Sequence, residues 1–194
     1  MLLVVAAAMT PVGCGRDENQ LVLFVDAEFD PMFADTSQPL HEANLGVAQS
    51  FTVLTDGKLD EFWLVVTQGE SVDSGTIRIT IRPLNGMGEP DPDPASSIIV
   101  PIDVDTSTLP ATLVDQFTVF SLKNEPGRDV LMGETYAIVV DFVSRATMTD
   151  VNPIARVLGQ VGDPYPDGSG ATGESGVAFT NNTDDYIFRT FVLR

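Results

Sequence analysis

Apolar and polar residues alternate along much of this chain, with the period of two that is typical of β-strands. The clearest case is the segment 75–84, in which three isoleucines alternate with Arg, Thr and Arg. Because successive side chains of a strand point to opposite faces, this pattern predicts a strand with one face against a core. In 135–143 both alternating sets are mostly apolar, which predicts a central strand that is covered on both faces.

Turn-rich segments containing Gly, Pro, Asp and Asn separate about nine such strands. The predicted strands are 21–26, 48–54, 59–67, 75–84, 96–104, 116–122, 135–143, 154–159 and 185–193. No amphipathic pattern long enough for a three-turn helix lies between them. We therefore expect an all-β fold, an antiparallel two-sheet β-sandwich that is jelly-roll-like, as a single domain over 21–194.

Composition narrows the classes of function. The chain has 194 residues, and 43% of them are apolar, which suits one globular domain with a core. Acidic residues outnumber basic residues by 28 to 10, so the net charge is -18. This sign excludes nucleic-acid binding by phosphate neutralisation and argues against docking on anionic lipid through a basic surface. A single Cys and a single His exclude a disulfide framework and a Cys/His metal cluster.

The first residues have the pattern of a sorting segment. Residues 1–13 contain a short apolar run, far below the roughly 20 residues that span a bilayer, and are interpreted as a signal peptide. The run ends at Gly13-Cys14, which resembles the bacterial lipobox, although Pro11 stands where that pattern prefers Leu. The resemblance implies lipidation of Cys14, a tether over 14–20 and a membrane-anchored lipoprotein at the periplasm or cell surface. The alternatives are ordinary secretion, with Cys14 removed, and no export.

Several segments, in their order along the chain, resemble the choice-of-anchor domain of exported bacterial proteins. They are 47–53, 59–66, 75–90, 131–142 with Leu131, Gly133, Thr135 and Tyr136, 162–170, and 184–192. Together they cover about residues 22–194. The resemblance implies a non-catalytic, jelly-roll-like module with no defined ligand, and here Cys14 is the expected anchor.

A structural calcium site is a candidate cofactor site. Ca²⁺ binds six to eight oxygen ligands, many of them carboxylates. Asp26 and Glu28 are two residues apart on the first predicted strand, and Asp184 and Asp185 precede the last one. The first and last strands of a jelly roll are often neighbours, so these four acids could meet. The alternative is that they are solvated edge and turn residues.

A sugar-binding surface is the second candidate, because exposed aromatic rings stack on sugar faces. Trp63 is the only Trp, and it falls on the outer face of its strand if Phe62 and Leu64 point to the core. Tyr165 lies in a Gly- and Pro-rich loop and is expected in solvent. The alternative for Trp63 is packing under a loop or against the N-terminal segment, which the apolar Val65 on the same face favours.

Catalysis has little support. His41 is the only imidazole, and nothing near it indicates a Ser-His-Asp or Cys-His arrangement. Paired carboxylates of a glycosidase would need a cleft that a sequence does not reveal. We therefore expect no enzyme but a surface or periplasmic binding module, whose partner is a glycan or another surface protein. The alternative is a structural component of a cell-envelope or extracellular assembly; the oligomeric state stays open.

Overall fold

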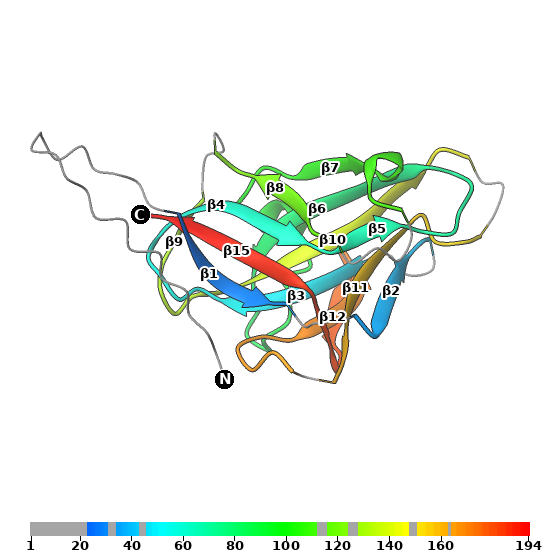
Figure 1. Cartoon of the computed structure of the whole chain (residues 1–194). Coiled ribbons are helices and arrows are strands. Elements are labelled where there is room, and N and C mark those ends of the chain that lie inside the picture. The colour runs from blue at the N-terminus through cyan, green and yellow to red at the C-terminus, as the bar shows by residue number, and fades with distance from the viewer. Residues whose placement is uncertain are drawn as a thin grey trace, which may run out of the picture.

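The computed structural model describes residues 23–30, 34–42, 46–111, 116–123, 128–147, 151–162 and 164–194 (Figure 1). Within these residues the regular structure is almost entirely β-strand, and every sheet is antiparallel. The prediction of an all-β antiparallel sandwich is confirmed. Cys14, the predicted signal peptide 1–13 and the tether 14–20 lie outside the described residues.

The first of the two large sheets has five strands. Its order is β1 (Leu23–Phe29), β15 (Phe188–Leu193), β4 (Gly57–Leu64) and β8 (Thr118–Ser121), with β9 (Asp129–Val130) also paired to β4. The first and last strands of the domain, blue and red in Figure 1, run side by side. The predicted neighbourhood of these two strands is therefore confirmed.

The second large sheet has six strands. Its order is β13 (Ala178–Asn181), β12 (Gly170–Glu174), β3 (Gly46–Thr52), β10 (Thr135–Arg145), β6 (Gly75–Pro83) and β7 (Ile102–Asp105). The chain crosses from this sheet to the five-stranded sheet between β3 and β4 and returns before β6. Such crossings are what a jelly-roll-like sandwich requires.

A short sheet and two 3-10 turns complete the fold. The short sheet has the order β14 (Asp184–Tyr186), β11 (Ala155–Val161) and β2 (Thr36–Leu40), with β5 (Val66–Gln68) also paired to β11. The 3-10 turns are η1 (Pro94–Ser96) and η2 (Thr106–Thr108). Asp93 and Asp105 cap them by accepting hydrogen bonds from backbone N–H groups at the start of each turn.

The alternation in β6 has the predicted effect on the core. Ile77, Ile79 and Ile81 are fully buried and pack in one cluster with Phe62 of β4 and Phe188 of β15. Each buried side chain of this size contributes roughly 1.5–3 kcal/mol through removal of apolar surface from water. This cluster lies between the two large sheets and is the main core.

Strand β10 is central, as predicted. It pairs with β3 on one side and with β6 on the other. Its inward residues join the main core, while Ala137 and Val139 on the outer face pack in a second, smaller cluster with Phe179 of β13. The six-stranded sheet is thus covered on both faces, which explains why both alternating sets of β10 are apolar.

The strand count was underestimated. The described residues contain fifteen strands rather than about nine, and β2, β9, β12 and β13 lie in segments where none was predicted. Strand β12 has no large apolar side chain, and Gly170 must be a glycine because a Cβ added there would meet the carbonyl oxygen of Asp184 at 1.9 Å. A strand that must contain glycine has no alternating pattern to detect. Of the predicted strand 96–104, only the end falls in β7.

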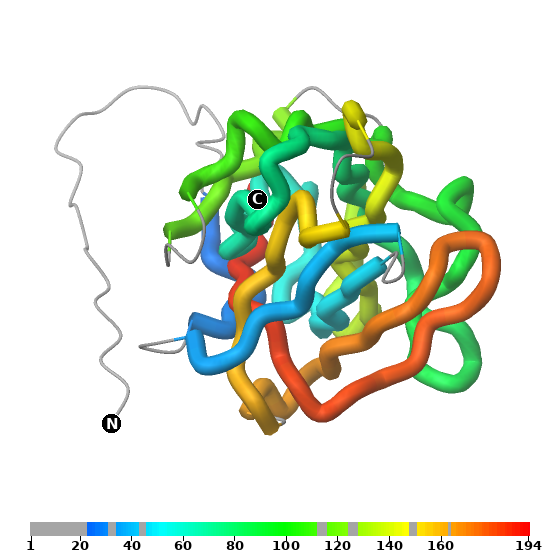
Figure 2. The backbone as a smooth tube through the Cα atoms, turned by 90° about the vertical axis from the view of Figure 1, so that its right-hand side faces the viewer, coloured from blue at the N-terminus to red at the C-terminus, as the bar shows by residue number. Residues whose placement is uncertain are grey.

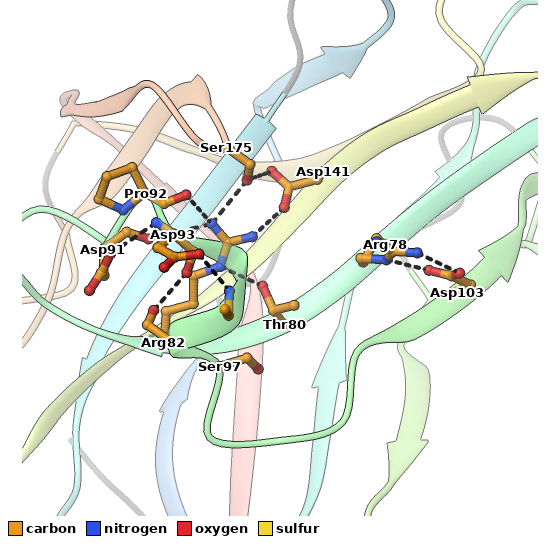
Figure 3. A network of polar contacts seen from close by, with 12 residues as sticks. Arg78, Thr80, Arg82, Asp91, Pro92, Asp93, Ser97, Asp103, Asp141 and Ser175 are labelled. Carbon is orange, nitrogen blue, oxygen red and sulfur yellow. Dashed lines mark hydrogen bonds and ion pairs between the residues drawn. The ribbon is translucent and has the colours of Figure 1, made fainter.

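The outer face of β6 holds a buried arginine (Figure 3). Arg82 has no exposed surface; its Nε donates to Thr80 Oγ1 at 2.8 Å and its Nη1 to Ser175 Oγ at 2.9 Å. Its Nη2 forms an ion pair with the carboxylate of Asp141 on β10. Burial raises the pKa of Asp141, against the opposing effects of the Ser175 hydroxyl and the Arg82 guanidinium.

Two distant segments cover this ion pair. Arg82 Nη1 also donates to the carbonyl oxygens of Asp91 and Pro92, in the loop that follows β6. The Gly176 N–H, in the turn between β12 and β13, donates to Pro92 O at 2.7 Å. Figure 2 shows this hairpin, in orange, beside the green loop after β6. The Asp- and Pro-rich stretch is therefore fixed in place by the arginine below it.

Candidate functional site

The outer face of the five-stranded sheet carries the one tryptophan. Phe62 and Leu64 of β4 are buried in the main core, so Trp63 between them points outward, as the alternation predicted. The strand register places Trp63 opposite Arg189 of β15 on one side and Val119 of β8 on the other. Trp63 is partly exposed, whereas Val119 is exposed.

Two phenylalanines hold the indole ring of Trp63. Its ring centroid lies 4.6 Å from that of Phe191 and 5.7 Å from that of Phe117, both in tilted arrangements. The indole Nε1–H donates to Glu61 Oε2 at 3.3 Å, and Glu61 Oε1 lies 3.8 Å from Lys123 Nζ. Among the described residues, the ring therefore packs against Phe191 of its own sheet and against Phe117, which directly precedes β8, and it is partly exposed.

Arg189 links this aromatic group to two carboxylates. Its Nε lies 3.0 Å from Glu28 Oε2, and its Nη2 pairs with the carboxylate of Asp30. The guanidinium carbon lies 5.7 Å from the ring centroid of Trp63 and 4.9 Å from that of Phe117. A cation at these distances is attracted by the electron-rich ring faces. Arg189 is thus held by charge on one side and by aromatic rings on the other.

A depression adjoins the arginine. It has a volume of about 490 Å³, and its lining residues are Glu28, Phe29, Asp30, Gln160 and Arg189. A small apolar cluster of Val65, Leu158 and Ile187, against which Phe29 and Phe117 pack, lies beside it. We call Glu28, Glu61, Trp63, Phe117, Arg189 and Phe191 the Trp63 face. It combines a partly exposed indole ring with carboxylate and guanidinium groups that form hydrogen bonds.

The exposure predicted for Tyr165 is wrong. Only 7% of this residue is exposed, and its ring packs edge-on against Phe188 of the main core at 5.2 Å. Burial raises the pKa of Tyr165 to about 12. Its backbone N–H donates to Asp185 Oδ2 at 2.8 Å, so the loop turns the ring inward. Tyr165 stabilises the core and offers no platform for a sugar ring.

The four acids predicted to bind calcium do not form one site. Although β1 and β15 are neighbours, Asp184 and Asp185 lie in β14 and pair with β11 of the short sheet. A bulge between residues 25 and 27 shifts the register of β1, so Asp26 is buried while Glu28 reaches Arg189 on the outer face. Among the residues that the structure describes, no three His, Cys, Asp or Glu side chains form a group that could hold a metal ion.

The two buried acids have other partners. Asp185 accepts hydrogen bonds from Gln49 Nε2 at 3.1 Å and from the Tyr165 backbone, so both of its oxygens are satisfied. Asp26 Oδ1 accepts from the Leu54 N–H at 3.1 Å, but Asp26 Oδ2 is buried without a hydrogen-bond partner. Burial therefore raises the pKa of Asp26 from 3.8 to about 6, and hydrogen bonds from Leu54 and Thr55 limit the rise.

Sequence reasoning singled out Trp63 and Glu28 but missed Arg189, Phe191, Phe117 and Asp30 as their partners. In the closing strand Arg189 and Phe191 alternate with the buried Thr190, which is a signal that both point outward. The sequence does not contain the register that places them beside Trp63.

No family model matches this chain, and no curated protein matches it. Within the described residues, no helix is both long enough and apolar enough to cross a membrane.

Proposed function

We propose that this protein is a non-catalytic binding module of an exported lipoprotein, and that it binds a glycan through the Trp63 face. The observation that supports this most is the partly exposed indole ring, fixed by Phe117 and Phe191 and bordered by Arg189 and Glu61. An aromatic ring held rigidly loses little conformational freedom when it binds, which favours stacking on a sugar. The carboxylate and guanidinium groups beside it suit sugar hydroxyls.

Export and anchoring belong to the same proposal. The apolar run before Gly13-Cys14 resembles a lipoprotein signal, and the ordered segments of the domain resemble the choice-of-anchor modules of exported bacterial proteins. A surface protein remains the other ligand class for this face. No catalytic step is part of the proposal, because the two carboxylates that line the depression, Glu28 and Asp30, both pair with Arg189.

The test is a polysaccharide-binding screen on the full chain with Cys14→Ser, alone and with Trp63→Ala. We expect saturable binding to at least one glycan, with affinity reduced at least about tenfold by Trp63→Ala, because the stacking surface is removed. Tyr165→Phe is the matched control: this ring is buried in the core, so the affinity is expected to stay unchanged. Thermal unfolding of each variant checks that the fold persists.

Each screen is run with Ca²⁺ and with a chelator. Glycan binding is expected to be equal with Ca²⁺ and with chelator, because the four candidate calcium ligands do not form one metal site. Equal affinities of the Trp63→Ala and parent chains would reject the Trp63 face as the binding site. A folded chain that binds no glycan would move the proposal to surface proteins.

A structural role in an assembly is the second candidate, and the edge strand β1 favours it. Within the described residues β1 pairs on one side only, with β15, and Leu23, Phe24 and Val25 are all exposed. An exposed apolar edge strand can pair with another chain. This candidate predicts a mass in solution that rises with concentration, and Phe24→Lys would abolish the rise.

A further inference from the structure

One end of the sandwich is built from three segments that the sequence keeps apart. They are the loop after β3, the segment between β9 and β10, and the start of β1. The Gly133 N–H donates to Val53 O at 2.8 Å, and the Met132 N–H donates to Asp56 Oδ1 at 2.6 Å. The Leu54 N–H donates to Asp26 of β1. These bonds join the segments into one surface, here called the tether end.

The tether end is unusually apolar for an exposed surface. The exposed fractions are 53% for Leu54, 59% for Leu131 and 68% for Met132, and Leu23 and Phe24 at the start of β1 are also more than two-fifths exposed. These include every exposed Leu and Phe among the described residues. All remaining exposed large apolar residues of the described chain are valines, except Met87. Clustered exposed apolar side chains mark an interaction surface.

The cations of this end differ from the other arginines of the chain in their partners. Five arginines elsewhere form ion pairs with carboxylates, namely Arg78, Arg82, Arg145, Arg156 and Arg189. The cations at the tether end pair with no carboxylate in the described part of the chain; they are Lys58, Arg128 and Arg194. The exposed acids nearby include Asp56, Asp129 and Glu134, and also Asp167, whose carbonyl oxygen accepts a hydrogen bond from Thr52 Oγ1 at 3.0 Å.

The position of the end relative to the expected anchor is fixed by chain length. Leu23 begins β1, and Cys14 precedes it by nine residues. Nine extended residues reach about 30 Å at most. A lipid on Cys14 would therefore keep this end within about 30 Å of the bilayer.

We propose that the tether end rests on a phospholipid surface, with Leu54, Leu131 and Met132 at the boundary between headgroups and acyl chains. Lys58, Arg128 and Arg194 then lie at headgroup level, where long cationic side chains extend to phosphate. This inference rests on the proposed lipid anchor at Cys14. The acidity of the chain does not exclude this contact, because the contacting side chains are apolar and no basic surface is needed. In this orientation the Trp63 face, which lies along the strands, stays open to a ligand.

The test uses the full lipidated chain in phosphatidylcholine vesicles. Met132→Cys is labelled with a fluorophore whose emission reports polarity, since the lipidated thiol of Cys14 does not react. We expect emission at shorter wavelength on vesicles and loss of intensity when the lipids carry a nitroxide on the acyl chain. Val72→Cys is the matched control, because Val72 is 85% exposed and precedes β6, whose first residue pairs with the last residue of β10, whereas the tether end lies at the start of β10. Its probe is expected to show neither change.

A second variant separates this inference from the anchor itself. Mass spectrometry first shows whether Cys14 carries lipid, and glycan binding is measured independently. The Cys14→Ser chain, which has no anchor, is then floated with the same vesicles; we expect Leu131→Glu with Met132→Glu to reduce the bound fraction several-fold. Equal emission from the Met132 and Val72 probes, or no effect of the two glutamates, overturns the proposal. A Met132 probe that is shielded without vesicles, in a concentration-dependent dimer, also overturns it.

Discussion

Two arginines, one on the outer face of each large sheet, have the same kinds of partner and opposite surroundings. Arg82 pairs with Asp141 and lies 5.9 Å from the ring centroid of Phe179. Arg189 pairs with Glu28 and lies over Trp63 and Phe117. Arg82 is fully buried, whereas the side chain of Arg189 is 28% exposed.

The difference lies in what covers each face. The loop after β6 and the turn between β12 and β13 close over Arg82, and their carbonyl and hydroxyl oxygens use its remaining donors. Nothing comparable closes over Arg189 among the residues described, and a depression opens beside it. The same combination of arginine, carboxylate and aromatic ring therefore stabilises the fold where loops cover it. Where no described loop covers it, the combination is available to a ligand.

The largest expected effect is on the covered arginine. Asp141→Ala leaves the Arg82 guanidinium buried without its counter-charge, which costs about 3–5 kcal/mol of the free energy of unfolding. Chemical denaturation measures this loss. The double variant Arg82→Met with Asp141→Leu removes both charges and is expected to recover most of it. A loss below about 1 kcal/mol in Asp141→Ala would show that Arg82 is solvated like Arg189.

Asp26 is a third case, a buried carboxyl that pairs with no arginine. Its expected effect on the free energy of unfolding lies between those of the covered and the open arginine. Its pKa is about 6 in the folded chain and 3.8 when unfolded, so its protonated form stabilises the fold at low pH. That contribution is fully present below pH 3.8 and is lost as the pH rises to about 6. It amounts to about 3 kcal/mol. Relative to the parent chain, Asp26→Asn should gain this amount between these pH values.

Urea unfolding of both chains across this pH range measures that difference. Asp103→Asn is the control with the opposite sign, because the Arg78 guanidinium lowers the pKa of Asp103. Its stability relative to the parent should fall as the pH rises. An Asp26→Asn chain whose stability parallels the parent at every pH would contradict burial of an ionisable Asp26.

The smallest effect belongs to the open arginine. The Glu28 side chain is 50% exposed, so its ion pair with Arg189 is solvated and screened. Glu28→Gln is expected to change the free energy of unfolding by less than about 1 kcal/mol. The same denaturation assay compares it with Asp141→Ala. A loss as large as that of Asp141→Ala would mean that the two faces do not differ in the way described above.

Much of the fold is readable from the sequence, because local alternation records which side chains face the core. The isoleucines of β6, the two-sided β10 and the outward Trp63 all lie where the pattern predicts. The calcium hypothesis failed for a local reason, the bulge that turns Asp26 inward, and for a topological one, since Asp185 belongs to β14. Neither a bulge nor the passage of the chain into another sheet changes the alternation of apolar and polar residues enough to be detected.

The sequence by itself determined that this chain forms an antiparallel β-sandwich and which side of β4 and β6 meets the core. Only the tertiary structure decided that Arg82 is buried and Arg189 is open. Both arginines occupy outward positions on alternating strands, so their local patterns are alike. Their surroundings depend on contacts between residues far apart in the chain, such as Arg82 with Ser175 and Arg189 with Glu28. Such contacts follow from the register of the sheets and the path of the loops, which a period of two does not encode.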